Sequence, residues 1–316
     1  MFENKRVLVT GGAGFVGTNV VKRFVAEGVK VRATLHKNDP QWDHPRMEYM
    51  ACDLESSRDC HRVCRDMDYV IMCAANSSGA AVMEKTPLVH LTPNLIMNLR
   101  MLEAAHASGV EKFLFISSNT VYPVTETPVN EDGVTHEFFE KYFVVGWMKA
   151  FSEIVCDMYA SKIQSPMATL VVRPGNLYGE YDKFDPEKSK VIPALIRRAV
   201  AGQDPFVVWG DGRDVKDFLY IGDFVEGLLA ALERLPSMVP VNLASGQPVT
   251  IRGVLSLILE LCDHGRARVQ FDTNKPTMIP KRLIDVSKAR TLLDFEPKTS
   301  LETGLLKTIN WYKKGL

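Results

Sequence analysis

A glycine-rich turn near the start of the chain constrains the fold more than any other segment. The stretch VLVTGGAGFVGTNVVKRF, residues 7–24, places glycines directly after an apolar strand and at the start of a helical stretch. Glycines at this spacing permit a tight turn, close approach of the backbone to a pyrophosphate and close packing of helix on strand. The strand, the spacing and the position predict a dinucleotide-binding turn rather than an ordinary loop. Its contacts are expected from Gly11, Gly14, Phe15, Val16 and Gly17.

Short apolar strands alternate with helical stretches through the first half of the chain. Strands are expected near residues 6–11, 30–35, 47–54, 68–75 and 112–118, and helices near residues 18–27 and 93–107. This alternation is typical of βαβ units, so we expect an α/β fold with a Rossmann-type doubly wound parallel sheet.

The second half of the chain has more prolines and shorter elements, which favours a smaller C-terminal α/β lobe that binds the substrate. We expect residues 1–173 to form the dinucleotide-binding domain, which also receives segments from about 215–245. Residues 174–316 are expected to form mainly the substrate lobe. The ligands would then bind between the sheet and this lobe.

The end of the second strand bears on which dinucleotide is bound. An acidic residue normally holds the ribose 2′-hydroxyl there, but this chain has Thr34, Leu35, His36 and Lys37. Two basic residues and no acid favour a 2′-phosphate, and hence NADP over NAD. Asp53, at the end of the third strand, is expected either to meet the adenine amine or to cap its own loop.

Composition excludes several classes of partner. Lysine plus arginine and aspartate plus glutamate number 38 each, so no net charge attracts nucleic acid or an anionic membrane. No apolar run reaches the roughly 18 to 20 residues that span a bilayer, and the N-terminus shows no signal-peptide pattern. A cytoplasmic protein with reduced cysteines is expected. Cys60, His61 and Cys64 lack the spacing of a zinc site, so no metal is expected.

Further motifs follow the glycine turn in a recognisable order. The stretches CDLE, CAA, FISSNTVYP, GWMKAFSE and VVRPGNLYG, and the C-terminal LIDVSKARTLLDFEPKTSLETGL, resemble those of the extended short-chain dehydrogenase/reductases. The resemblance covers essentially the whole chain. It implies an NAD(P)-dependent epimerase, dehydratase or reductase of nucleotide sugars. It also implies cofactor contacts at His36, Lys37, Asp53, Leu54, Ala74, Ala75, Lys149, Pro174 and Asn176.

The stretch NLYGEYDKFDPEKSKVIPALIRRAV, residues 176–200, resembles the substrate loop of GDP-fucose synthases. The resemblance implies a GDP-linked sugar more than a UDP-linked one. It places Asn119, Asn176, Lys190, Val191, Arg197, Trp209 and Arg213 at the substrate. The residues themselves support a diphosphate clamp, because Lys190 and Arg197 lie near one helix. For Arg198 a solvated basic face is the better interpretation.

The catalytic residues that the family implies are only partly present. A serine or threonine, a tyrosine and a lysine carry the proton there, and Ser118 and Lys149 match. Val145 stands where the tyrosine belongs. Three readings stay open: Tyr142 at i, i+7 from Lys149 replaces it; the proton passes through Ser118, Thr120 or water; or hydride chemistry is lost.

Other departures from the family narrow the reaction. Dehydratases carry an acid pair where this chain has Asn119 and Thr120, so 4,6-elimination is not expected. GDP-fucose synthases carry a cysteine and a histidine where this chain has Thr120 and Lys190, which disfavours double epimerisation, although Lys190 could serve as one base. SSNTVY resembles SSATVY of 4-epimerases, which favours a C4-centred epimerase or 4-keto reductase acting on a GDP-linked hexose or heptose.

Two other functions remain open. A family member that lost catalysis could bind a nucleotide sugar or NAD(P) for another purpose. An NADP-dependent reductase of non-nucleotide ketones is suggested by VRATLHKNDP, residues 31–40, but the GDP-type loop counts against it.

The helical stretch at residues 137–163 is apolar on more than one face. A helix that only covers a sheet needs one apolar stripe, so a second stripe needs another partner. In the family this helix joins a four-helix bundle between subunits, which implies a homodimer. Burial under the C-terminal lobe is the alternative.

Asp217, Asp223 and Asp285 are expected to be structural caps.

Overall fold

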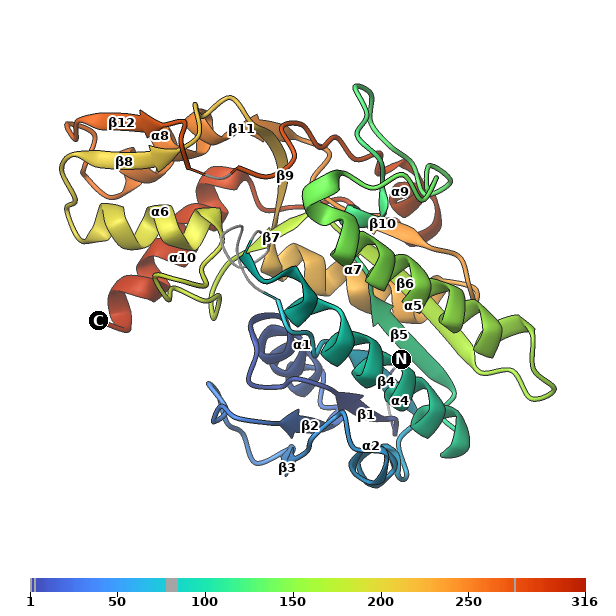
Figure 1. The fold of residues 1–316 in the computed structure, drawn as a ribbon. Coiled ribbons are helices and arrows are strands. Elements are labelled where there is room, and N and C mark those ends of the chain that lie inside the picture. The colour runs from blue at the N-terminus through green and yellow to red at the C-terminus, as the bar shows by residue number, and fades with distance from the viewer. Residues whose placement is uncertain (1, 3, 78–84, 276) are drawn as a thin grey trace.

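The computed structural model describes residue 2 and residues 4–77, 85–275 and 277–316. A large parallel sheet with helices on both faces forms most of the molecule, and a smaller lobe lies at one end (Figure 1). This confirms the expected Rossmann-type α/β fold.

The central sheet has seven strands, and every pair of neighbours is parallel. From β1 the chain adds β2 and β3 on one side of the sheet and then β4, β5 and β6 on the other. The place where the direction changes is the switch point at which doubly wound sheets bind ligands. The glycine turn therefore begins at this switch point. In spatial order the strands are β10 (Val241–Leu243), β6 (Ala168–Pro174), β5 (Lys112–Ile116), β4 (Tyr69–Met72), β1 (Arg6–Val9), β2 (Lys30–Leu35) and β3 (Met47–Ala51).

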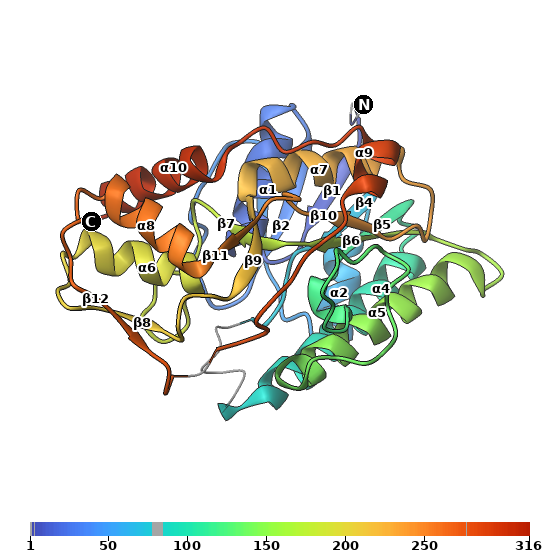
Figure 2. The ribbon, with the colours of Figure 1, turned by 90° about the horizontal axis from the view of Figure 1, so that it is seen from above.

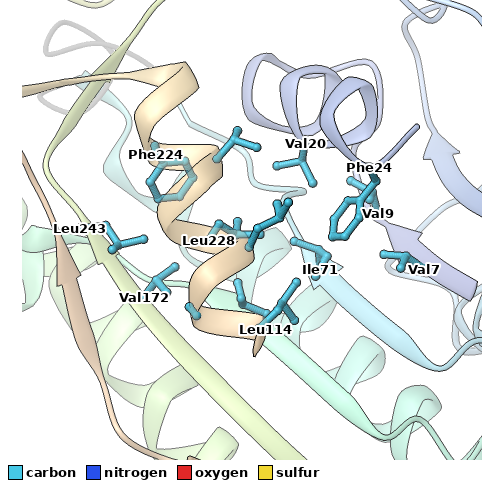
Figure 3. Close-up of a cluster of buried hydrophobic side chains, with 14 of the residues drawn as sticks. Val7, Val9, Val20, Phe24, Ile71, Leu114, Val172, Phe224, Leu228 and Leu243 are labelled. Carbon is cyan, nitrogen blue, oxygen red and sulfur yellow. The ribbon is translucent and has the colours of Figure 1, made fainter. Parts of the chain in front are cut away.

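Both faces of this sheet are buried, as a parallel sheet requires. Figure 2 shows α1 (Phe15–Ala26) and α7 (Ile221–Arg234) on one side, and α2 (Ser57–Cys64), α4 (Thr92–Ala107) and α5 (Phe143–Ser161) on the other. Because strand side chains alternate, Val7 and Val9 join the first core while Leu8 joins the second. In the first core, Phe224 and Leu228 of α7 meet Val20 and Phe24 of α1 over the strands (Figure 3).

The smaller lobe has a core of its own, which buries one face each of α6 (Val191–Val200), α8 (Ile251–Leu261) and α10 (Leu301–Lys314). Two small sheets accompany these helices. One contains β7 (Asn176–Tyr178), β9 (Val215–Tyr220) and β11 (Pro248–Thr250), and the other pairs β8 (Phe206–Trp209) with β12 (Val269–Asp272). The chain returns from this lobe to add α7, β10 and α9 (Ser287–Leu293) to the large sheet.

The helix predicted for residues 137–163 begins later, at Phe143. His136 has a left-handed φ of 63°, and a short 3₁₀ turn, η3 (Glu140–Tyr142), precedes α5. Phe138 packs edge-on against Trp147, and a Cβ on Gly146 would meet the Phe138 ring at 2.8 Å. The segment before the helix therefore folds back over it, because this buries an aromatic ring that a longer helix would leave in solvent.

The three expected structural acids act as caps. Asp217 accepts backbone N–H groups of Ser245 and Gly246, Asp223 accepts that of Thr299, and Asp285 accepts that of Ser287. Across the described ranges, no helix combines the length and hydropathy needed to cross a bilayer.

Candidate active site

The glycine turn is packed too tightly for side chains. Gly11 has a φ of +67°, its N–H donates to Thr34 Oγ1 at 2.9 Å, and a Cβ there would lie 2.9 Å from Ala74 Cα. A Cβ on Gly17 would lie 2.1 Å from the Gly11 carbonyl oxygen. The ends of β1, β2 and β4 therefore meet at a bare stretch of backbone.

The start of α1 has the properties of an anion-binding site. Its N-cap is Gly14, no side chain caps it, and its first turn holds no acid. The first N–H groups of a helix have no acceptor within the helix, so those of Phe15, Val16 and Gly17 can bind a pyrophosphate. The Phe15 side chain belongs to the core, so Phe15 can contribute only its backbone. The turn and helix thus fit the pyrophosphate of a dinucleotide.

The expected adenosine contacts lie at the ends of β2 and β3. His36 and Lys37 are exposed, and Ala75, at the end of β4, is exposed as well. Asp53 is exposed, but its Oδ1 accepts the backbone N–H of Glu55 at 3.0 Å, so one carboxylate oxygen caps the loop. Leu54 is buried in the second core.

Lys149, Ser118 and Thr120 gather at the carboxyl end of β5. Lys149 Nζ donates to the Ile116 carbonyl at 2.7 Å and lies 4.7 Å from the centre of the Phe115 ring. Burial lowers the pKa of this lysine to about 8. Ser118 caps the 3₁₀ turn η2 (Asn119–Val121) by accepting the Thr120 N–H at 3.2 Å.

Two other side chains of this turn face in different directions. The Thr120 hydroxyl is buried and has no hydrogen-bond partner among the described residues, which leaves it free to bind a ligand. Asn119 instead donates to the Pro174 carbonyl at 3.0 Å, so its amide joins η2 to the end of β6.

A buried ion pair behind Lys149 was not predicted from the sequence. Glu153, one turn after Lys149 on α5, binds Arg173 of β6 at 2.6 Å, and both side chains are nearly inaccessible. Ser117 Oγ donates to the same carboxylate. Arg173 also donates to the Glu131 carbonyl and to the Tyr122 hydroxyl. The signal in the sequence was a glutamate four residues after Lys149 and an arginine inside an apolar strand.

Tyr142 lies at the N-cap of α5 and is half-buried. Burial raises the pKa of its phenol to about 12, and the charges that act on it are those of Arg282, which lowers it, and Asp214, which raises it. The charges that act on Lys149 come from Glu153 and Cys156. Different charged groups therefore act on Tyr142 and on Lys149, the two residues of the expected catalytic pair.

The expected substrate residues other than Asn119 lie on the smaller lobe. Lys190 is the exposed N-cap of α6 and Val191 begins that helix. Arg197 is half-buried, and its Nε has no hydrogen-bond partner in the part of the chain that the structure describes. Trp209, at the end of β8, is 43% exposed. Arg213 is exposed, with an ion pair to Asp211 at 3.7 Å. Asn176 instead donates to the Asp217 carbonyl at 3.0 Å, which ties β7 to β9.

The expectation of a solvated Arg198 was wrong. Its guanidinium donates to the carbonyl oxygens of Ala194 and Val207 and lies 5.0 Å from the centre of the Phe206 ring. Burial lowers the pKa of this arginine. Arg198 thus joins α6 to β8.

Two further residues of the substrate loop were missed. Asp182 is buried, and its Oδ2 has no hydrogen-bond partner within the described ranges. Lys183 reaches from this loop to the Ser77 carbonyl, beyond the end of β4, at 3.3 Å. In the sequence, only the adjacent opposite charges of Asp182 and Lys183 could have indicated that these two residues matter.

Replacing Gly17 by alanine should abolish dinucleotide binding and lower the melting temperature. The new Cβ would meet the Gly11 carbonyl oxygen, so α1 would have to move away from the turn. Calorimetric titration with NADPH and NADH, together with thermal unfolding, measures both effects. Gly265→Ala is the matched control, because a Cβ there meets nothing within 4 Å. Unchanged NADPH binding by the Gly17 variant would contradict the assigned turn.

The stability of the cofactor-free protein should depend on Lys149 between pH 8 and 10.5. The folded state holds this pKa at about 8, against an ordinary value of 10.5 for an exposed lysine. Between these values the unfolded chain binds more protons, so stability rises with pH. Relative to Lys149→Met, the wild type should gain on the order of 3 kcal/mol over this window. Urea unfolding of both proteins at pH 7.5, 9 and 10.5 measures the change, and a constant difference would show an unperturbed lysine.

Comparison with known proteins agrees with this geometry. Residues 7–244 match the family described as "NAD dependent epimerase/dehydratase family". GDP-L-fucose synthase 1 of Arabidopsis thaliana is 30% identical over an alignment of 322 positions, which covers 99% of this chain and 95% of the relative. A dTDP-4-dehydro-6-deoxy-D-allose reductase of Streptomyces bikiniensis is 27% identical over 99% of this chain and 97% of its own length.

Among solved structures, a UDP-glucose 4-epimerase of Thermotoga maritima with UDP-glucose is 26% identical. It has a TM-score of 0.88 and matches 98% of this chain and 99% of its own. The resemblance drawn from the motifs is confirmed: this chain belongs to the NAD dependent epimerase/dehydratase family, a family of nucleotide-sugar enzymes within the extended short-chain dehydrogenase/reductases.

Proposed function

We propose that this protein is an NADP(H)-dependent enzyme that oxidises, reduces or epimerises C4 of a GDP-linked hexose or heptose. The observation that carries the proposal is the position of Lys149. It lies at the carboxyl end of β5, beside the turn that holds Ser118 and Thr120, and burial lowers its pKa. A desolvated lysine at the ligand edge of a dinucleotide-binding sheet suits a site that handles a hydride and a proton.

The bound dinucleotide would supply or accept the hydride. Gly11, Gly14 and the first turn of α1 would hold its pyrophosphate, and Lys149 would hold the nicotinamide ribose. Exposed His36 and Lys37, at the end of a strand that carries no acid, support the 2′-phosphate of NADP. Six free cysteines support a cytoplasmic location, where thiols stay reduced.

The C4 reaction is supported by the turn after β5. Ser118 and the unpartnered hydroxyl of Thr120 offer hydrogen bonds to a sugar hydroxyl or ketone. Neither Asn119 nor Thr120 can serve as the acid that elimination requires.

The choice of a GDP sugar is supported by the lobe and by the relatives. Lys190 and Arg197 on α6, with the exposed indole of Trp209 on β8, offer charges for a diphosphate and a face for a base. The relative from Arabidopsis thaliana is named a GDP-L-fucose synthase.

A second function is favoured by Val145. This half-buried aliphatic residue stands four residues before Lys149, where the family has its proton-donating tyrosine. A protein that keeps the glycine turn and lacks this phenol could bind a nucleotide sugar without turning it over. Turnover measurements distinguish the two functions.

We expect the wild type to turn over at least one GDP-linked 4-keto sugar or parent GDP sugar in the presence of NADPH or NADP⁺. The test follows absorbance at 340 nm and product mass over a panel of GDP-, UDP- and dTDP-linked sugars. Val145→Tyr should raise turnover by about 10²-fold or more, since general acid catalysis contributes that much. Val145→Phe is the control of equal bulk without a hydroxyl.

Two results would contradict the enzyme proposal. The first is intact GDP-sugar binding with no turnover by the wild type on any substrate. The second is turnover that appears only in Val145→Tyr, which would identify the natural protein as a binder that lost its acid.

We further propose a homodimer formed through α5. Its large apolar residues recur at spacings of three and four, so they share one face, and each is at least 40% exposed: Phe143, Trp147, Phe151, Ile154 and Met158. Since α4 packs beside α5, two copies of this pair can form a four-helix bundle. Closed twofold dimers are the commonest soluble assemblies.

Phe151→Glu should convert a dimer into a monomer, because a carboxylate at the centre of the apolar stripe would be buried unpaired. Light scattering coupled to size exclusion measures the mass. Leu306→Glu on α10 is the matched control, because Leu306 is 43% exposed and lies on another helix. A wild type of 35.4 kDa in solution would refute the dimer.

A further inference from the structure

The loop that follows β7 is bonded to the first helix of the dinucleotide-binding domain. Asn19 Nδ2 of α1 donates to the Glu180 carbonyl at 3.0 Å, and Lys22 Nζ of α1 donates to the Tyr181 hydroxyl at 2.7 Å. Lys22 Nζ also lies 4.7 Å from the centre of the Tyr181 ring. We call residues 180–183 the bridging segment, because they connect α1 to a loop that belongs to the substrate lobe.

The same two residues also contact the smaller lobe. The Tyr181 ring centre lies 5.1 Å from that of Trp311 on α10. The Glu180 carboxylate accepts the hydroxyl of Tyr220, the last residue of β9, at 2.8 Å. Glu180 and Tyr181 therefore each have one partner on α1 and one on the lobe, so a movement of the lobe away from α1 would break one set of contacts.

The backbone of Tyr181 is strained. Its φ is 68°, in the left-handed region that a bulky residue rarely adopts. Such a conformation persists only where surrounding contacts hold it. Here Lys22 holds the side chain from α1, while Trp311 packs against it from the lobe. The bond from Lys22 therefore stabilises this conformation of the segment against a relaxed one in which α1 is released.

On one side, Lys22 belongs to the elements that surround the proposed dinucleotide site. It lies on the helix whose first turn would bind the pyrophosphate, and its Nζ is 5.7 Å from the centre of a Trp42 ring in the loop after β2. Gln41 of that loop donates to the Ala13 carbonyl in the glycine turn at 2.9 Å. A dinucleotide bound there would order the turn, this loop and α1 together.

On the other side, the bridging segment leads into the proposed nucleotide-sugar site. The loop continues to Lys190, the N-cap of α6, where the diphosphate is proposed to bind. Asp182, inside the segment, is buried, and its Oδ2 has no hydrogen-bond partner within the described ranges. The conformation of residues 180–183 thus affects the shape of the site that the nucleotide sugar enters.

We propose that the bond between Lys22 and Tyr181 couples the two ligand sites, with Lys22 as the positioning residue. A dinucleotide on α1 holds Lys22 in place, and Lys22 holds the bridging segment in the conformation that the nucleotide sugar binds. By linkage, the nucleotide sugar tightens dinucleotide binding by the same factor. The two states are the bonded segment described here and a released one. This inference rests on the proposed function for the identity of the second ligand.

Hydrogen exchange tests the coupling with the dinucleotide alone. Mass spectrometry follows the amides of the bridging segment with and without saturating NADPH or NADH, whichever binds. The dinucleotide should slow their exchange by about fivefold or more in the wild type, and by less than about twofold in Lys22→Met. Arg23→Met is the matched control and should respond as the wild type does, because Arg23 pairs with Glu27 and Glu226 instead. Equal slowing in the wild type and Lys22→Met, or none in the wild type, would overturn the inference.

Calorimetric titration with GDP tests the coupling between the two sites. Saturating dinucleotide should lower the Kd for GDP by about fivefold or more in the wild type. In Lys22→Met, in Tyr181→Phe and in the double variant this Kd should change by less than about twofold, because each lacks the same hydrogen bond. Tyr181→Phe keeps the ring beside Trp311, so its loss of coupling would identify the hydroxyl as the link.

A purely structural role for this contact predicts a lower melting temperature in the variants with an unchanged response of the GDP affinity to the dinucleotide. That result would overturn the proposal. If the wild type does not bind GDP, the proposed GDP-sugar function fails, and hydrogen exchange with the dinucleotide alone decides this inference.

Discussion

The buried ion pair between Glu153 and Arg173 sets the relation between α5 and the sheet. Both charges are nearly inaccessible, and each also binds a second element: Glu153 accepts from Ser117 after β5, and Arg173 donates to the Glu131 carbonyl. A buried pair of this kind adds little net stability against apolar residues, but breaking it leaves an unpaired charge. A shift of α5 along the sheet is therefore costly. Lys149, one turn away, is held at the end of β5 as a result.

Three cations lie near the carboxyl ends of β4 and β5. Lys149 donates to the Ile116 carbonyl at the end of β5, Arg282 to the carbonyls of Tyr122 and Pro123 after η2, and Lys183 to the Ser77 carbonyl after β4. Burial lowers the pKa of Lys149 and of Arg282, so these two charges act through little water. Such a site suits an anionic substrate and an oxyanion that forms during proton transfer.

The large sheet and the glycine turn could be predicted from the sequence because their signals are local. Apolar runs of strand length, separated by helical stretches, predicted strands close to the observed ones. Gly17 indicated a close contact with the Gly11 carbonyl oxygen that only glycine tolerates. The start of α5 could not be predicted in this way. Residues 137–142 have a helical pattern, but Phe138 gains more burial by folding back on Trp147. Arg198 likewise looked solvated, since nothing nearby in the sequence reveals Val207 as its acceptor.

The sequence by itself determined the family, the parallel sheet, the dinucleotide turn and the absence of the usual tyrosine, because each depends on residue types at short, regular spacings. Only the tertiary structure decided which charges meet. Glu153 pairs with Arg173, and Arg282 donates to the carbonyl oxygen of Tyr122, which is 160 positions away in the printed chain. Burial and electrostatic coupling depend on distance in space and on the exclusion of water, and neither is written in the order of the residues.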